Sequence, residues 1–203
     1  MLVELARARR TVRRFSSRPP PVTAILRAIE AAKEAPSGMN AQPWHFLVVT
    51  DPGIKRGIRE ACEAVERRFH ARVQGKLKGW LAETGITPEK PFLTNAPFLI
   101  LVFARTDAPY WLQSTWLAIG YLLLALEEEG LGTVTYTPPD PTPVQTLLSA
   151  PMVYKLQTIL PVGYPTDPKP KYPRKALAEV ATLNGFVRPA PEAPAQPREG
   201  GDT

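Results

Sequence analysis

Apolar residues recur at three- and four-residue spacing in three long stretches of the chain, a pattern that predicts helices. These stretches cover 22–32, 54–81 and 112–129. Shorter helices are predicted at 1–8 and 142–149. Runs of β-branched, aromatic and aliphatic residues predict buried strands. These runs cover 44–50, 98–104, 133–137 and 156–162. Strands separated by helices favour α/β or α+β packing on a central sheet.

For two of the predicted helices the sequence also predicts which side is buried. In the helix at 54–81 one stripe is apolar, which predicts a buried face. That stripe consists of Ile58, Cys62, Val65, Phe69, Val73, Leu77 and Trp80. The helix at 112–129 is nearly apolar on all sides, so we expect a central, buried element. Residues 82–96 are expected to form a loop.

The length of 203 residues suits one domain, which we place at 1–188, followed by a Pro-rich tail at 189–203 that we expect to be disordered. The chain is 44% hydrophobic and 22% charged, as in soluble globular proteins. Apolar runs are too short for a membrane span, and the first residues show no export signal, so we expect a cytoplasmic location. A lone Cys62 excludes an internal disulfide and cysteine-built metal sites, and no metal site is predicted.

The formal net charge is +6, which admits nucleic acid, anionic membranes or anionic small ligands as partners. The basic residues of 55–78 alternate with apolar positions at helical spacing, as on a solvated helix face. Because the chain also lacks a known nucleic-acid-binding pattern, we expect no nucleic-acid or membrane partner. Solubility accounts for most of the charge.

Four residues near the N-terminus, Arg9, Arg10, Thr11 and Arg13, offer permanent positive charge and a hydroxyl donor. Arginine presents planar, always-charged donors that match a phosphate group. Taken alone, such a cluster is also compatible with a solvated basic arm.

The loop at 35–44 is rich in free donors. Pro36 and Pro43 stiffen its ends, Gly38 permits unusual backbone angles, and Ser37 and Asn40 hydrogen-bond in both directions. These groups suit the polar edge of a flat heteroaromatic ring, although an ordinary helix-to-strand turn anchored by Trp44 is the simpler interpretation. A phosphate together with a polar-edged ring indicates a nucleotide-like cofactor, and we predict FMN.

Four motifs in order support a family resemblance. Arg9-Arg10-Thr11-Val12-Arg13-Arg14-Phe15 is followed by an apolar helix and then by Ala35-Pro36-Ser37-Gly38-Met39-Asn40-Ala41-Gln42-Pro43-Trp44. Later come Gly130-Leu131-Gly132-Thr133 and, near the end, Leu160-Pro161-Val162-Gly163-Tyr164-Pro165 with Pro173-Arg174-Lys175. Over residues 5–188 this order resembles the FMN-dependent nitroreductase superfamily.

The resemblance implies an α+β sandwich with a central mixed, largely antiparallel sheet flanked by helices, and an intertwined homodimer with the flavin at the interface. It implies that Arg9, Arg10, Thr11 and Arg13 bind the phosphate, ribityl chain and pyrimidine edge, Arg13 stabilising charge on the reduced ring. It also implies that Arg174 is a C-terminal ligand of the phosphate. The loop that reaches the flavin from the partner subunit corresponds to Pro36, Ser37, Gly38 and Asn40. The backbone groups that line the ring correspond to Thr135, Tyr136 and Thr137.

The implied activity is an FMN-dependent NAD(P)H oxidoreductase that reduces nitroaromatics, quinones or similar small acceptors by two-electron ping-pong transfer through flavin N5. No catalytic acid or base is required. Alternatives on the same scaffold are an enone reductase, a reductive dehalogenase, and a flavin-cleaving or azoline-oxidising enzyme. Ala35-Pro36-Ser37-Gly38 also resembles the dehalogenase branch, whereas Asn40 and Gln42 resemble ordinary nitroreductases. A flavin-binding protein without turnover and a basic nucleic-acid-binding protein are the remaining alternatives.

The chain departs from the family pattern at two places. Tyr172 stands where the family often has lysine, so Lys171 is the candidate replacement at the phosphate. The segment Thr135-Tyr136-Thr137-Pro138 replaces the family's usual sequence beside the ring, which leaves the substrate open.

Overall fold

A computed structural model describes residues 2–166 and 171–186 of the chain. The chain divides into two units, Met1–Lys171 and Tyr172–Thr203, which are described separately. The tail predicted at 189–203, and the domain boundary predicted at 188, lie outside the described residues.

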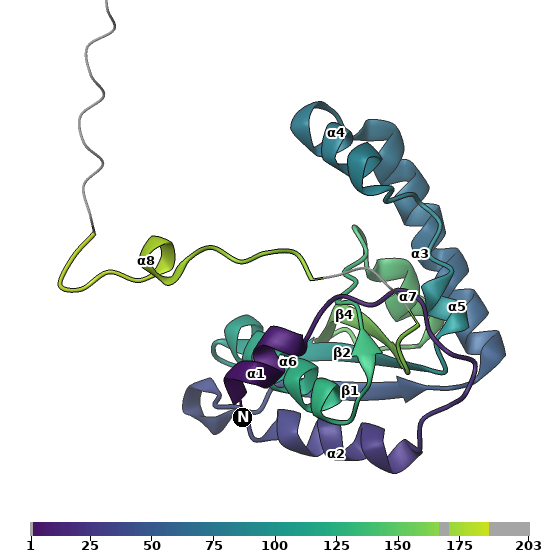
Figure 1. The fold of residues 1–203 in the computed structure, drawn as a ribbon. Helices are drawn as coiled ribbons and strands as arrows, with labels where there is room; N and C mark the ends of the chain where they lie inside the picture. Colours follow the sequence, from purple (N-terminus) through teal and green to yellow (C-terminus); the bar gives the residue numbers. More distant parts are fainter. Residues whose placement is uncertain (1, 167–170, 187–203) are drawn as a thin grey trace, which may run out of the picture. The chain divides into compact units, whose positions relative to one another are not determined.

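A four-stranded sheet forms the centre of the first unit (Figure 1). Its strands are β1 (Trp44–Val49), β2 (Phe98–Arg105), β3 (Gly132–Thr133) and β4 (Tyr154–Gly163), in the order β1-β2-β4-β3. All neighbouring strands are antiparallel, and in the described part of the chain one parallel bridge joins Thr11 to Thr133. The predicted mixed, largely antiparallel sheet with flanking helices is therefore confirmed. The two inner strands, β2 and β4, are buried almost throughout, because helices cover both faces of the sheet and apolar residues must point both ways.

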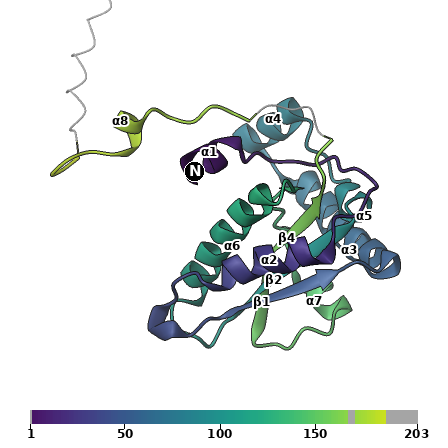
Figure 2. The same ribbon diagram turned by 60° about the horizontal axis from the view of Figure 1, so that its bottom comes forward.

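Helices α2 (Val22–Lys33) and α6 (Trp111–Glu128) lie side by side on one face of the sheet, as Figure 2 shows. Ile100 and Val102 of β2 pack with Leu122 of α6 in the core on this side. Arg27 of α2 donates two hydrogen bonds of 2.7 Å to the carboxylate of Glu129, at the end of α6. A short helix, α1 (Leu2–Ala8), also contacts α6.

The opposite face is covered by α3 (Pro52–Arg72), α5 (Phe92–Asn95) and α7 (Thr142–Leu147). Leu99 and Leu101, which alternate with Ile100 and Val102 along β2, pack here with Ile58 and Cys62 of α3. The continuous apolar run of β2 therefore supplies both core layers.

The prediction of one helix over 54–81 is wrong. The chain leaves helical geometry at Val73 and Gln74, both extended, and resumes in α4 (Gly75–Thr84) from Gly75, whose φ is +64°. Glycine adopts such a positive φ without steric cost, so the helix breaks there. The apolar stripe consequently ends early, and Leu77 and Trp80 are 46% and 52% exposed.

Two smaller expectations also need correction. Residues 82–96, expected to be a loop, contain the end of α4 and all of α5. The strand expected at 133–137 pairs continuously only at Gly132–Thr133, with an isolated bridge from Tyr136 to Ile159. No helix among the described residues is long and apolar enough to cross a membrane.

In the second unit the described residues are 172–186, with one helical turn, α8 (Leu177–Val180). The carboxylate of Glu179 accepts a hydrogen bond of 2.7 Å from the backbone N–H of Ala176 and so caps this turn.

Candidate functional site

The basic N-terminal segment runs beside the strand that follows α6. Thr11 forms the parallel bridge with Thr133, and the backbone N–H of Val12 donates to the Thr133 carbonyl at 2.9 Å. Val12 is 2% exposed and packs on Gly132, where an added Cβ would lie 2.8 Å from Val12 Cγ2. Because alternate residues of an extended chain point to opposite sides, anchoring Val12 inward turns Thr11 and Arg13 outward. Both are exposed, and Arg9 and Arg10 are half-buried.

The segment predicted to line a flavin ring continues from this bridge. The backbone N–H and C=O of Tyr136 pair with Ile159 at 3.1 and 2.8 Å, and its side chain is buried. Thr135 is half-buried and Thr137 is exposed; the Thr137 hydroxyl donates to the Gln157 carbonyl at 3.3 Å. The structure thus joins residues 9–13 to residues 133–137 through the contacts of Thr11 and Val12 with Thr133, and we call these two segments the cradle edge.

The loop at 36–42 is strained. Met39, Asn40 and Gln42 have φ of 54°, 53° and 45°. Non-glycine residues in this left-handed region cost about 1–3 kcal/mol each in the less favoured cases, and such strain concentrates at functional sites. Gly38 lies against Tyr110, whose own φ is 51°; an added Cβ would be 2.5 Å from Tyr110 Cδ2.

Hydrogen bonding within the loop leaves donors available. Gly38 N–H donates to the Ser114 hydroxyl at 3.3 Å, and Gln42 N–H donates to the Ser37 hydroxyl at 3.1 Å. Within the described part of the chain, the N–H groups of Ser37 and Met39 have no acceptor. An external acceptor can therefore reach two backbone donors of this loop.

The loop and the part of the cradle edge at Thr133 lie at opposite ends of α6. Gly38 contacts the start of this helix, at Tyr110 and Ser114, whereas Thr133 follows its end. The helix has 18 residues and therefore a length of about 27 Å. One copy of the chain consequently does not bring Gly38 to Thr133, where the basic segment joins the rest of the cradle edge.

Arg174 belongs to the second unit, where its guanidinium donates to the Tyr172 carbonyl at 3.1 Å. Its phosphate contact remains a prediction. Lys171 belongs to the first unit, and its ammonium donates to the carbonyls of Ala6 and Arg7 at 2.6 and 3.1 Å. These carbonyls belong to the last turn of α1, directly before Arg9, so Lys171 caps the helix that leads into the basic segment.

A buried charged cluster lies next to the cradle edge, beneath Tyr136. The Lys90 ammonium is 3.3 Å from the Glu66 carboxylate, and these residues are only 4% and 6% exposed. The Tyr136 hydroxyl donates to Glu66 at 3.0 Å, and His70 Nε2 lies 3.4 Å from the same carboxylate. Burial, with the neighbouring Cys62 and Glu66, raises the pKa of Tyr136 far above its usual value, so this hydroxyl remains a donor.

Sequence reasoning missed this cluster, although one signal was present. Glu66 follows Val65 and stands four residues after Cys62, which places a carboxylate at the border of the apolar stripe. Lys90 gave no signal, because it lies in a segment expected to be an irregular loop. Cys62 itself is buried, and this burial raises the pKa of its thiol to about 12, so the thiol is an inert core group, as expected.

Comparisons with known proteins define the class. The model of the Nitroreductase family matches residues 6–164. The chain belongs to this family.

Comparisons with individual proteins narrow the likeness to one group of the family. The chain is 56% identical over 177 residues to an iodotyrosine deiodinase of Thermotoga neapolitana, covering 87% of this chain and 95% of the relative. An iodotyrosine deiodinase of Nematostella vectensis is 36% identical over 191 residues, covering 86% of this chain and 72% of the relative. Among solved structures, an oxidized iodotyrosine deiodinase bound to FMN and 3-iodo-L-tyrosine matches with a TM-score of 0.88 and 53% identity, covering 92% of this chain and all of that one.

Proposed function

We propose that this protein is a reductive dehalogenase that removes halogen from the ring of a halogenated tyrosine. It is an enzyme of the Nitroreductase family, and its cofactor is FMN. Its deiodinase relatives favour this activity, one of the alternatives considered from the sequence, over reduction of nitroaromatics or quinones.

Two features of the cradle edge support FMN binding in this proposal: its positive charge and its outward-facing side chains. The packing of Val12 on Gly132 fixes the extended backbone, so that Thr11 and Arg13 face outward. Arg9, Arg10 and Arg13 would hold the phosphate and the polar ring edge, and Thr135 and Thr137 would line the ring. Arg174 would complete the phosphate site.

The loop contacts come from a second copy in this proposal. Pro36, Ser37, Gly38 and Asn40 reach the ring of the partner's cofactor, because the length of α6 separates Gly38 from Thr133 within one chain. The protein is then a homodimer with two equivalent sites. When bound, FMN supplies the two-electron chemistry, and the side chains bind and orient the reactants.

The net reaction breaks the aryl carbon–halogen bond and forms a carbon–hydrogen bond at the same carbon. It consumes two electrons and one proton and releases a halide ion. A reduced nicotinamide dinucleotide is the proposed source of the electrons and becomes oxidised.

The proposed substrate class, an amino acid, is argued from the buried pair of Glu66 and Lys90. A buried ion pair is weak evidence for a stabilising role, because removing both charges from water can cost as much as their attraction returns. An amino-acid substrate bears an ammonium and a carboxylate at the same carbon. In this proposal Glu66 pairs with the substrate ammonium and Lys90 with its carboxylate, next to the segment that lines the ring.

The experiment compares two aryl iodides with FMN-loaded protein and excess dithionite, with iodide release as the readout. 3-Iodotyrosine carries both charges of the amino acid, whereas 2-iodophenol carries neither. The double variant Glu66→Gln/Lys90→Met should raise the KM for 3-iodotyrosine at least tenfold, since each lost contact with a charged group contributes about 1.5–3 kcal/mol. Turnover of 2-iodophenol should not change.

The matched control is Glu60→Gln/Lys78→Met, which removes two exposed charges from α3 and α4. FMN content and melting temperature report whether each variant is folded. Absence of iodide release from wild-type protein would contradict the dehalogenase activity. An equal rise in KM for both iodides would contradict the role of the charge pair.

A further inference from the structure

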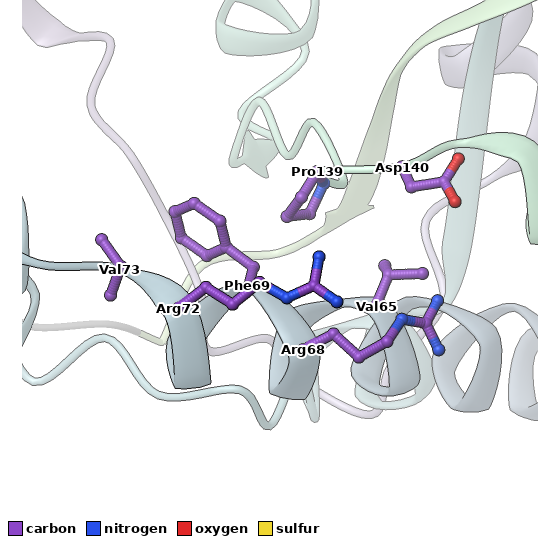
Figure 3. Close-up of a pocket in the computed structure, with 7 residues that line it drawn as sticks. All are labelled: Val65, Arg68, Phe69, Arg72, Val73, Pro139 and Asp140. Carbon is purple, nitrogen blue, oxygen red and sulfur yellow. The ribbon is translucent and has the colours of Figure 1, made fainter.

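A cavity of about 390 Å³ lies between α3 and the segment that follows the cradle edge (Figure 3). Its volume is in the range of about 300–1,000 Å³ that is usual for ligand pockets. Val65 and Phe69 of α3 and Val73, which directly follows this helix, line the cavity, and Pro139 faces them. The wall is therefore apolar, with one aromatic ring.

Two arginines of α3, Arg68 and Arg72, line the same cavity one helical turn apart. Figure 3 shows the Arg72 guanidinium reaching under Pro139 and the Arg68 guanidinium on the side of Asp140. Within the described residues neither arginine forms an ion pair, whereas Arg59 of the same helix is bound to Glu63 at 2.6 Å. Two permanent cations thus border an apolar cavity, and among the described residues neither has a carboxylate within ion-pair distance.

Asp140 is the one acidic residue that lines the cavity, and it already has a partner. Its carboxylate accepts a hydrogen bond of 2.9 Å from the backbone N–H of Thr142, at the start of α7. This bond, with a contribution from the charge of Arg68, lowers the pKa of Asp140, so the group is a fixed anion. One negative charge is set against two positive ones, and the cavity favours an anionic ligand.

We propose that this cavity binds the adenosine 2′-phosphate end of a reduced nicotinamide dinucleotide phosphate. The adenine ring packs between Phe69 and Pro139, and Arg68 and Arg72 bind the 2′-phosphate. This inference rests on the proposed function, which requires a two-electron donor. It adds the site that selects the phosphorylated form of that donor.

The position of the cavity suits this ligand. Pro139 is two residues after Thr137, and two residues of extended chain span at most about 7 Å. A donor held by its adenosine end at Pro139 therefore begins next to the segment that lines the flavin ring, and its nicotinamide end can extend along it. Arg68 and Arg72 bind the donor and take no part in the electron transfer itself.

The first test measures binding of a fragment by calorimetry on the full-length, FMN-loaded protein. Adenosine 2′-monophosphate should bind, and adenosine 5′-monophosphate should bind more weakly, because its phosphate is attached at the other end of the ribose. The variant Arg68→Ala/Arg72→Ala should weaken binding of the 2′-phosphate roughly tenfold or more. Arg67→Ala is the matched control, since Arg67 is exposed on α3 and does not line the cavity.

The second test measures anaerobic bleaching of the flavin absorbance with NADPH, NADH and dithionite in turn. The double variant should need roughly tenfold more NADPH, with no change for NADH or dithionite. Unchanged binding of the fragment, or equal losses with NADPH and NADH, would overturn the proposal. Failure of wild-type protein to release iodide with dithionite would instead overturn the proposed function, so the two failures are distinguishable.

Discussion

The cradle edge and the loop at 36–42 are built in opposite ways. At the cradle edge an unstrained extended segment is fixed by the packing of Val12 on Gly132, and charged groups project outward from it. In the loop, three non-glycine residues adopt positive φ, and two backbone N–H groups are left without acceptors in the described chain. The cradle edge therefore presents charged side chains to a ligand, whereas the loop presents backbone N–H donors.

In the proposed dimer these two regions come from different copies of the chain. Gly38 contacts the start of α6 and Thr133 follows its end, about 27 Å away along the helix. Trp116, Leu117 and Tyr121 of α6 are 38%, 48% and 44% exposed. Such a row of large apolar side chains is typical of an interaction surface. This surface of α6 is the candidate contact with the second copy in the proposed dimer.

The largest expected effect comes from removing charge at the cradle edge. Arg9→Ala should weaken FMN binding by roughly 10–100-fold, because it deletes a charge-assisted bond to a dianionic phosphate. Titration of apoprotein with FMN, followed by quenching of flavin fluorescence, measures the Kd.

A matched control is Arg7→Ala, which removes an exposed arginine of α1 two positions before Arg9 in the sequence. In the described residues the Arg9 guanidinium has no protein partner, so its removal should leave the melting temperature unchanged. Equal Kd values for the two variants would contradict the assignment of Arg9.

A smaller effect is expected from a single methyl group in the loop. Gly38→Ala would place a Cβ 2.5 Å from Tyr110 Cδ2, which must displace the loop. Dehalogenation should slow about tenfold, because misplacing contacts by less than an ångström already reduces turnover. In Gly38→Ala/Tyr110→Ala the contact at 2.5 Å is gone and the Cβ of residue 110, at 3.1 Å, is the nearest remaining obstacle, so activity should return in large part. Gly79→Ala is the control, since its Cβ would meet nothing within 4 Å.

The smallest effect concerns stability away from both regions. Burial alone would raise the pKa of Glu63, but hydrogen bonds from the Lys90 backbone N–H and the Arg59 guanidinium outweigh it and lower the pKa. The associated stability is present above the unfolded pKa of about 4.3 and is lost as the pH falls through the lower folded value.

Glu63→Gln should therefore reduce the free energy of unfolding by roughly 1 kcal/mol at neutral pH and by less in acid. Urea denaturation at several pH values measures this difference. Glu60→Gln, on the same helix but exposed, should show no such trend. A constant difference for Glu63→Gln across the range would refute the argument.

Much of the fold could be predicted from the sequence, because hydrophobic periodicity records burial. Strands β1, β2 and β4 and helices α2 and α6 lie within a few residues of the predicted ranges. The long helix at 54–81 failed because periodicity continues through Val73 and Gln74, and only Gly75 marked the break. Apolar spacing cannot tell a bent pair of helices from a straight one.

The candidate site was less accessible to sequence reasoning. The arginines and the loop were identified by motif, but their separation by α6 became visible only in three dimensions. The pair of Glu66 and Lys90 joins two segments 24 positions apart, one of which was expected to be an irregular loop. A long-range pair of this kind leaves no local pattern in a single sequence.

A mixed dimer tests most directly whether the site is shared between two copies. One chain carries Arg9→Ala/Arg13→Ala, the other carries Gly38→Ala, and differently tagged copies are co-expressed and purified as the heterodimer. In a shared site, one of the two positions combines an intact cradle edge with an intact loop, so iodide release should recover to about half of the wild-type rate. A heterodimer no more active than the mean of the two mutant homodimers would show that each chain builds its site alone.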